Sequence, residues 1–554
     1  MLVLAGCVSL PTSGPVQQVA PRAADGDSLV QVIPSGPTMD ARPVDVVRGW
    51  LTAMRAFPVS TDVARSFLTE EAAQSWEPSR RTRIYSSYAS SAARTISGGV
   101  RVELRTRPVA RLNARGAFTP VFGQAEQTQT LRLVQTSEGW RLTEPPDELL
   151  LSEAFFIEYF RPFDLYFFDR TGEALIPDTV WLPLGDQLAT RLVTGLLAGP
   201  SSWLGNQATT ALTTDPASAV SVPVRSDGVA VVQLGDSAVR LSDAQRESLS
   251  AQLAWTLQQV TGVESVQLSA DGAPLAVPAA GSPQSAEAWA QYDPSGPPSR
   301  RQLYGVRRGG VVAVEDEDVT PVNGWWGTAA PDATAVSVER SLTRIAVVDT
   351  AGALRVGPYI TDDGEDVETW YSSTGRLVDP QWDRTGRLWA LDRSSGGATV
   401  VTVTDGTWRS VPLGRLAAAG VRELAVSPSG ARVAALVDRW PPSQDAADTP
   451  AAGPTLVVAR VVRSATGVVR RLDRAYPVDA AELRDLSSPV WAAPAQVGVL
   501  ARLPGDTDQP YRIAIDSSGV AGGSLSGDPL LGPVGARSRR TASPGADRRP
   551  RPPH

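Results

Sequence analysis

The sequence contains a single histidine, a single cysteine and no lysine. The histidine is His554, the last residue, in a tail rich in proline and arginine where no packed structure orients an imidazole. We therefore do not expect Ser-His-Asp or Cys-His catalysis, or a histidine-containing metal site. Because all 52 basic residues are arginine, a Walker A phosphate loop and a Schiff-base lysine are also excluded. Carboxylates, hydroxyls and backbone groups remain, and we expect no catalytic residue, no cofactor and no bound metal.

The one cysteine, Cys7, excludes disulfides and paired-cysteine redox or zinc sites. It follows an apolar stretch that ends in Leu4-Ala5-Gly6, and this pattern resembles the lipobox of bacterial lipoproteins. The resemblance implies that the Cys7 thiol carries a diacylglycerol and that cleavage makes Cys7 the new N-terminus. The alternative is a buried cysteine near the chain end. Only six residues precede Cys7, fewer than the roughly 7–15 apolar residues of a signal peptide, so we expect the true start to lie upstream.

Length and composition indicate a globular chain of several domains. At roughly 150 residues per domain, 554 residues suggest about three or four domains. The sequence is 42% hydrophobic and 20% charged, which is typical of soluble globular proteins. A net charge of -7 would repel a phosphate backbone, so nucleic acid is not an expected partner. After Cys7 no apolar run is long enough to predict a membrane-spanning helix.

The first domain is expected over 41–147, after a flexible spacer over 8–40 that follows the signal remnant 1–7. Pro43 suits the first position of a helix whose apolar stripe includes Val47 and Leu51. Thr69 is a candidate cap for a second helix. Leu104 and its neighbours then alternate with arginines as in a half-exposed strand. Helices followed by an antiparallel meander describe an α+β domain that resembles the NTF2-like shape, and a structural or partner-binding role is favoured over an enzyme.

A compact α/β sandwich is expected over 180–275, after an aromatic connecting segment at 148–179 that we interpret as interdomain core. Asp186 is predicted to cap its first helix, which ends at Gly199-Pro200. Ser242 and Gln245 form the sequence pattern of a capping box for its second helix. The segments Leu196-Leu197-Ala198-Gly199-Pro200, Val229–Leu234 and Gly262-Val263 resemble the GerMN domain. That resemblance implies a binding or scaffolding module of the extracytoplasmic envelope.

After a Pro/Gly-rich linker at 276–300, one short phrase recurs and predicts a β-propeller over 301–525. Its aligned arginines, Arg344, Arg387 and Arg432, lie about 43 to 45 residues apart, which matches the ~40–50-residue period of propeller blades. A weaker fourth copy starts near Ser488. The length allows five or six blades, and a long β-sandwich is the alternative. The last segment, 526–554, carries six arginines against Asp547 in its final part and is expected to be a disordered basic tail.

Two acidic clusters are candidate metal sites. The clusters 315–318 and 362–366 offer the carboxylate oxygens that calcium prefers, but neither has EF-hand spacing. We therefore expect solvated loop charge. Paired carboxylates also suffice for glycoside hydrolysis, but no pair is singled out by the sequence.

The order of lipobox, NTF2-like domain, GerMN-like domain and propeller resembles the actinobacterial lipoprotein family LpqB. The resemblance implies a lipid-anchored accessory protein on the outer face of the cytoplasmic membrane, attached through Cys7. Its implied partner is the extracytoplasmic domain of a sensor histidine kinase of the MtrB type, whose signalling in envelope homeostasis and cell division it would modulate. It assigns no catalytic residue. The alternatives are a carboxylate-based cell-wall glycan hydrolase and a propeller lipoprotein that senses a small molecule.

Overall fold

The computed structural model describes residues 30–122, 125–213, 220–270, 272–278, 281–295, 303–315, 318–394, 397–440 and 453–522. Cys7, most of the expected spacer and the basic tail lie outside these ranges. None of the helices in the described ranges has the length and apolar character needed to cross a membrane. The chain divides into two compact units. The larger one consists of 76–91, 103–130 and the chain from Pro146 onward.

The smaller unit contains the first helices and part of the N-terminal sheet. Its elements include α1 (Pro43–Ala53), α2 (Asp62–Arg65), α3 (Glu70–Ser75), β2 (Arg94–Ile96), β6 (Gly139–Leu142) and the end of β5 (Gln127–Thr136). Pro43 opens α1 as predicted, and Val47 and Leu51 are buried on the side that packs on β6. The Thr69 side chain accepts a hydrogen bond from the amide of Ala72 in α3, which confirms the predicted cap.

The first part of the larger unit is a group of strands and one helix. It comprises η1 (Pro78–Arg80), β1 (Arg81–Ser90), most of β3 (Gly99–Asn113), β4 (Phe118–Pro120), β7 (Leu149–Ser152) and α4 (Glu153–Tyr159). β1 pairs antiparallel with β3 and parallel with β7. In the whole sheet the strand order is β6-β5-β3-β1-β7, with β2 and β4 also pairing with β3. The predicted α+β class of this region is confirmed, as is the alternation along β3, where Leu104 is buried and Arg105 is exposed.

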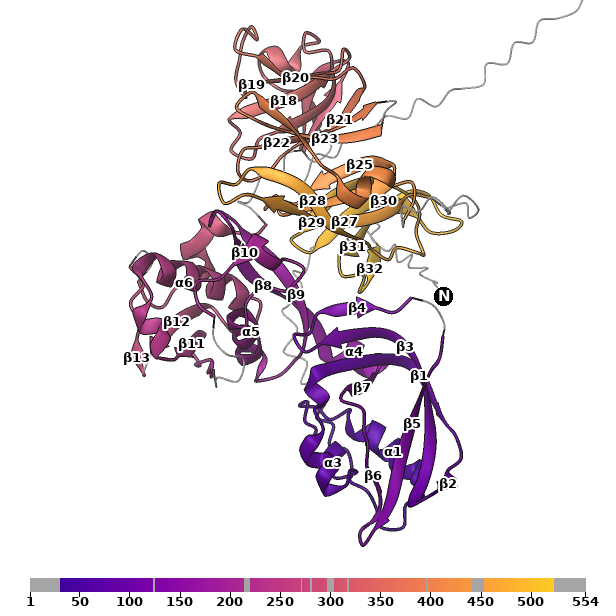
Figure 1. The fold of residues 1–554 in the computed structure, drawn as a ribbon. Helices are drawn as coiled ribbons and strands as arrows, with labels where there is room; N and C mark the ends of the chain where they lie inside the picture. Colours follow the sequence, from indigo (N-terminus) through magenta and orange to yellow (C-terminus); the bar gives the residue numbers. More distant parts are fainter. Residues whose placement is uncertain are drawn as a thin grey trace, which may run out of the picture. The chain divides into compact units, whose positions relative to one another are not determined.

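The middle domain spans about 160–295 and packs two helices against short sheets (Figure 1). Its elements are β8 (Phe160–Asp169), β9 (Leu175–Pro183), α5 (Leu188–Leu197), η2 (Gly205–Gln207), β10 (Ala208–Thr209), β11 (Val229–Leu234), η3 (Asp236–Arg240), α6 (Asp243–Leu257), β12 (Ser265–Ala270), β13 (Ala273–Pro274) and η4 (Ala286–Tyr292). The capping box predicted for α6 is present, with Ser242 and Gln245 bonded reciprocally. The cap predicted at Asp186 is wrong. α5 begins at Leu188 after Gln187, and no side chain caps it.

Two segments expected to connect domains are instead built into the middle domain. In the segment expected over 148–179, β8 pairs with β9, and Phe163, Phe167 and Phe168 belong to the middle domain's own hydrophobic core. In the segment expected as a linker over 276–300, η4 contributes the buried Trp289 to the same core. Most aromatic residues of β8 therefore belong to the core of this domain, whereas Phe156 of α4 stacks on both Phe118 of β4 and Trp181 of β9, as expected for a contact between domains.

The C-terminal domain consists of five antiparallel sheets that follow one another along the chain (Figure 1). The strands are β14 (Leu303–Arg307), β15 (Gly310–Glu315), β16 (Asp318–Pro321); β17 (Ala333–Val338), β18 (Arg344–Asp349), β19 (Ala353–Pro358), β20 (Glu368–Ser372); β21 (Arg376–Trp382), β22 (Leu388–Ser394), β23 (Gly397–Thr404), β24 (Thr407–Val411); β25 (Val421–Val426), β26 (Arg432–Val437), β27 (Thr455–Arg463), β28 (Val469–Pro477); β29 (Arg484–Ala493), β30 (Gln496–Arg502), β31 (Gln509–Ala514) and β32 (Val520–Gly522). Separate successive sheets are the arrangement of propeller blades, not of a long β-sandwich.

The sequence repeat corresponds to one structural position. Arg344 and Arg432 open the second strand of their sheets, and Arg387 lies directly before the second strand of its sheet. The fourth copy also matches, since Trp491 lies in the first strand of the last sheet and Gln496 opens the second. The first strands of neighbouring sheets lie against each other from β14 through β17, β21 and β25 to β29.

Candidate functional site

Three buried arginines of the propeller domain face the middle domain, and both domains belong to the larger compact unit. Arg432 opens β26, while Arg460 and Arg463 lie near the end of β27. Arg432 and Arg460 are directly opposite each other in the antiparallel pair. All three side chains are buried, which is rare for arginine unless its charge is satisfied by partners. We define this group and its contacts as the arginine joint.

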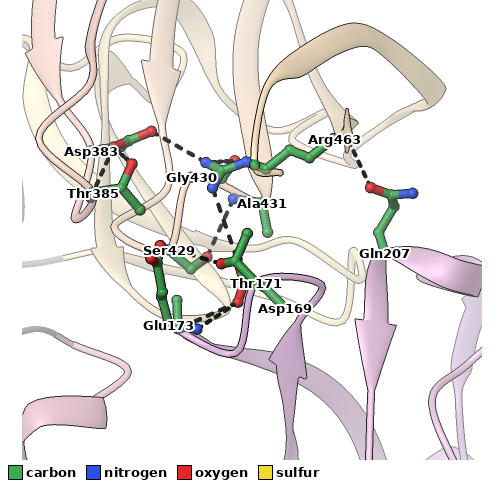
Figure 2. Close-up of polar contacts among 12 residues, drawn as sticks. Asp169, Thr171, Glu173, Gln207, Asp383, Thr385, Ser429, Gly430, Ala431 and Arg463 are labelled. Atoms are coloured by element: carbon green, nitrogen blue, oxygen red, sulfur yellow. Dashed lines mark hydrogen bonds and ion pairs between the residues drawn. The ribbon is translucent and has the colours of Figure 1, made fainter. Parts of the chain in front are cut away.

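Arg463 connects the two domains directly (Figure 2). One terminal nitrogen of its guanidinium lies 3.2 Å from Asp383 Oδ2 and donates to the carbonyl of Gly430 at 2.9 Å. The other terminal nitrogen lies 3.9 Å from Asp169 Oδ2 in the middle domain. Its backbone amide donates to the side-chain oxygen of Gln207 at 2.7 Å. Arg463 therefore contacts the middle domain through a long ion pair of its side chain and a hydrogen bond of its backbone amide.

The two carboxylates beside Arg463 also hold their own turns in place. Asp383 accepts a hydrogen bond from the Thr385 hydroxyl at 2.7 Å (Figure 2). It also accepts one from the Trp389 indole at 2.9 Å. Asp169 accepts from the hydroxyl of Thr171 at 2.8 Å and from two backbone amides of the β8–β9 turn. Both carboxylates are therefore held in place by hydrogen bonds that do not involve Arg463, which lowers the conformational cost of their ion pairs with it.

Arg460 bonds to the backbone of the middle domain. Its guanidinium forms a fork with Asp473, at 2.8 and 2.9 Å, on the neighbouring strand. The remaining terminal nitrogen donates to the carbonyls of Trp203 and Leu204 at 2.7 and 2.8 Å. Trp203 in turn packs edge-on against Tyr476 of β28. Arg460 therefore orients the 201–204 turn of the middle domain against the propeller.

Arg432 is the repeat arginine that lacks an acid. In the preceding sheets Arg344 pairs with Glu339, and Arg387 pairs with Asp383. The equivalent position, defined by the same backbone hydrogen bond to the arginine carbonyl, is Ser427 in the third copy. Arg432 instead donates to the carbonyl of Pro177 in β9 and lies 5.3 Å from the Trp203 ring. Serine at position 427, where the two preceding copies have Glu339 and Asp383, is the sequence feature that would have pointed to Arg432.

Burial at the joint shifts several pKa values. Burial lowers the pKa of the Arg432 guanidinium, with smaller opposing effects from nearby acidic groups. Burial raises the pKa of Asp164 in β8, although the Thr179 hydroxyl donates to it at 2.6 Å. Burial also raises the pKa of Tyr476. Each shift disfavours the charged form of its group, as expected where water is excluded.

A small cavity lies beside the joint and is lined partly by Asp169, Gln207 and Arg463. Its volume of about 10 Å³ is about the room that a single water molecule needs. An organic substrate or cofactor does not fit this cavity, because ligand pockets of that kind measure about 300–1,000 Å³.

Five carboxylates that are at most 9% exposed in the described residues each lie within 4 Å of an arginine. The five are Glu148, Asp169, Asp178, Asp349 and Asp383, with partners Arg83, Arg463, Arg115, Arg355 and again Arg463. The arrangement is therefore suited to holding surfaces together.

The structure describes only some of the sites that the sequence predicts. Cys7 lies outside the described residues. Asp362 and Asp363 of one acidic cluster are exposed, whereas Asp316 and Glu317 of the other lie outside the described residues. Across the described ranges no group of three or more His, Cys, Asp or Glu side chains is placed to hold a metal ion. The arginine joint itself was not predicted, because its partners are about 250 residues apart in sequence.

Comparison with known proteins gives matches along most of the chain. Family models match in chain order: "Lipoprotein LpqB, N-terminal domain" at 36–157, "Sporulation and spore germination" at 164–276 and "Lipoprotein LpqB beta-propeller domain" at 309–540.

Curated relatives agree with these models. Lipoprotein LpqB of Thermobifida fusca is 27% identical over 96% of this chain and 90% of the relative. Lipoprotein LpqB of Mycobacterium tuberculosis is 29% identical over 70% of this chain and 68% of the relative. The first GerMN domain of the sporulation protein GerM from Bacillus subtilis is 24% identical, covering 23% of this chain and 94% of that structure, with a TM-score of 0.19. The chain therefore belongs to the LpqB family of lipoproteins, with an N-terminal α+β domain, a GerMN-type domain and a C-terminal β-propeller.

Proposed function

We propose that this chain is a lipid-anchored accessory protein on the outer face of the cytoplasmic membrane that acts by recognition, without catalysis. Its proposed partner is the extracytoplasmic domain of a two-component sensor histidine kinase of the MtrB type. Binding there would modulate signalling in envelope homeostasis and cell division. Membership of a lipoprotein family and the lipobox-like residues before Cys7 support the anchor. The partner follows from the family resemblance.

The observation that carries the proposal is the arginine joint, where two of the three arginines are bonded to carboxylates: Arg463 pairs with Asp383 and Asp169, and Arg460 pairs with Asp473. A glycan hydrolase needs two carboxyl groups that flank a bound sugar. The cavity beside the joint, about 10 Å³ in volume, has no room for a sugar. The pair of Arg463 with Asp169 joins the propeller to the middle domain, so the joint is suited to holding two recognition domains together.

The lipid anchor would supply much of the binding free energy. A tether confines the domains to a thin layer beside the membrane, where a membrane-bound kinase has an effective concentration of the order of mM. A contact of modest affinity is then largely occupied. Release from the membrane should weaken signalling even if the contact surface is unchanged.

Membrane fractionation of cells tests the anchor. The wild-type chain should sediment with membranes, and Cys7→Ala should appear in the soluble fraction because the acyl group is lost. The matched control is Ser9→Ala, which changes a nearby residue outside the lipobox-like pattern. Equal membrane fractions for wild type and Cys7→Ala would contradict the anchor.

Crosslinking in intact cells tests the partner. The wild-type chain should capture the sensor kinase, and Cys7→Ala should capture less of it at equal expression. Captured material without the kinase, from a chain that is membrane-bound, would contradict the proposed partner and leave the anchor in place.

A further inference from the structure

The N-terminal domain contains a strongly basic stretch in an acidic chain. Between Arg80 and Phe122 there are nine arginines and one acidic residue, Glu103. The whole chain carries a net charge of -7, so the remainder is more acidic still. Such a separation of charge is typical of a surface that meets an anionic partner.

The structure places several of these arginines on one face of β1 and β3. Along β3 the alternate residues Leu104, Thr106, Pro108, Ala110 and Leu112 are buried. The intervening Arg105 and Arg111 are exposed, and Arg107 is half-buried. Arg83 of β1 lies directly opposite Arg111, so Arg81, two residues earlier, is on the same face. We call Arg81, Arg105, Arg107 and Arg111 the basic face.

The other side of these strands is already covered. Phe118 of β4 pairs with the buried Leu112 and stacks on Phe156 of α4, with ring centroids 6.2 Å apart. α4 also packs against β1. The basic face therefore points away from the helix that closes this part of the sheet.

The basic face is incompletely neutralised. Arg83 is paired with the buried Glu148, and Arg107 lies 3.7 Å from Glu126. Within the described residues no acidic group lies within 4 Å of the guanidinium of Arg81, Arg105 or Arg111. The charges of Arg81, Arg105 and Arg111 are therefore available to an external anion.

We propose that the basic face binds the phosphate headgroups of anionic phospholipids in the membrane that holds the Cys7 lipid. Arginine matches phosphate geometry with parallel N–H donors. A lipid surface is favoured over a soluble polyanion by Phe122, which is 63% exposed just beyond β4, where Val121 bonds to Val109 of β3. Aromatic rings of this kind insert at the boundary between headgroups and acyl chains. The location of this membrane rests on the proposed anchor at Cys7.

Vesicle co-sedimentation tests the proposal with the full chain carrying Cys7→Ala, so that no acyl group contributes. Binding is expected to vesicles containing phosphatidylglycerol, to be absent for pure phosphatidylcholine, and to fall steeply as salt is raised. The triple variant Arg81→Gln, Arg105→Gln, Arg111→Gln should lower the partition coefficient by about a hundredfold, since each arginine near an anionic surface contributes about fivefold. The corresponding Arg→Lys triple variant should keep most of the binding and shows that the fold tolerates changes at these positions.

The matched control removes the same charge elsewhere. Arg376, Arg409 and Arg439 are exposed residues of the propeller domain, and their Gln triple variant should bind vesicles like the parent. Equal losses from both triple variants would show a net-charge effect and overturn the proposal. Binding to a soluble polyanion such as polyphosphate, without binding to vesicles, would overturn the lipid assignment. Vesicle binding together with an unacylated Cys7 in cells would instead sustain the basic face and reject the anchor.

Discussion

The replacement Arg463→Met tests whether the arginine joint stabilises the larger unit. Methionine keeps the apolar stem but removes the charge that lies 3.2 Å from Asp383 and 3.9 Å from Asp169. Breaking a buried ion pair from one side typically costs 3–5 kcal/mol, because the remaining charge stays buried. Asp383 keeps Arg387 at 3.4 Å, and Asp169 keeps its turn amides. We therefore expect the lower end, about 3 kcal/mol.

Urea denaturation followed by tryptophan fluorescence measures this cost. The matched control is Arg471→Met, which removes an arginine 3.4 Å from Asp473 with 56% of its side chain exposed, and should cost less than about 1 kcal/mol. Arg432→Met should be nearly neutral, because the described residues leave no carboxylate that depends on Arg432 for a direct ion pair. A cost for Arg463→Met no larger than for Arg471→Met would refute the reasoning.

Three further predictions concern single sites. Burial raises the pKa of Glu339, but hydrogen bonds from Arg344 and Thr343 outweigh it and hold the pKa below the ordinary 4.5. The stability that Glu339→Gln removes should therefore be fully present above pH 4.5 and should be lost as the pH falls through the lowered pKa of the folded state. Urea midpoints measured across pH test this. Ser242→Ala should cost about 1 kcal/mol through loss of the α6 capping box. The control is Ser248→Ala, at a half-buried position of the same helix where the hydroxyl donates to the carbonyl of Ala244. Equal urea midpoints for the two would contradict the cap. Burial, and then the hydrogen bond to Asp392, raise the pKa of Tyr371 to about 12; the ultraviolet titration should lose a component near that pH in Tyr371→Phe, and an unchanged curve would contradict the assignment.

Local sequence signals predicted much of the fold. Pro43 marked the start of α1, Ser242 and Gln245 marked α6, and the recurring arginines marked the second strands of three sheets. Each of these signals depends on residues a few positions apart, where capping and periodicity act.

Signals that depend on tertiary packing were less informative. Asp186 had the right type for a cap but lies too far from the first turn of α5. The aromatic residues of β8 indicated a hydrophobic core. Only the pairing of β8 with β9 showed that this core belongs to the middle domain. Ser427 is informative only once the structure aligns it with Glu339 and Asp383.

Titration calorimetry tests the central claim of recognition most directly. The purified Cys7→Ala chain would be titrated with the purified extracytoplasmic domain of the sensor kinase. A tethered interaction at an effective concentration of the order of mM requires saturable binding with a Kd below about 1 mM, and that is the expected result. The absence of saturable heat at sensor-domain concentrations of about 1 mM would contradict the account.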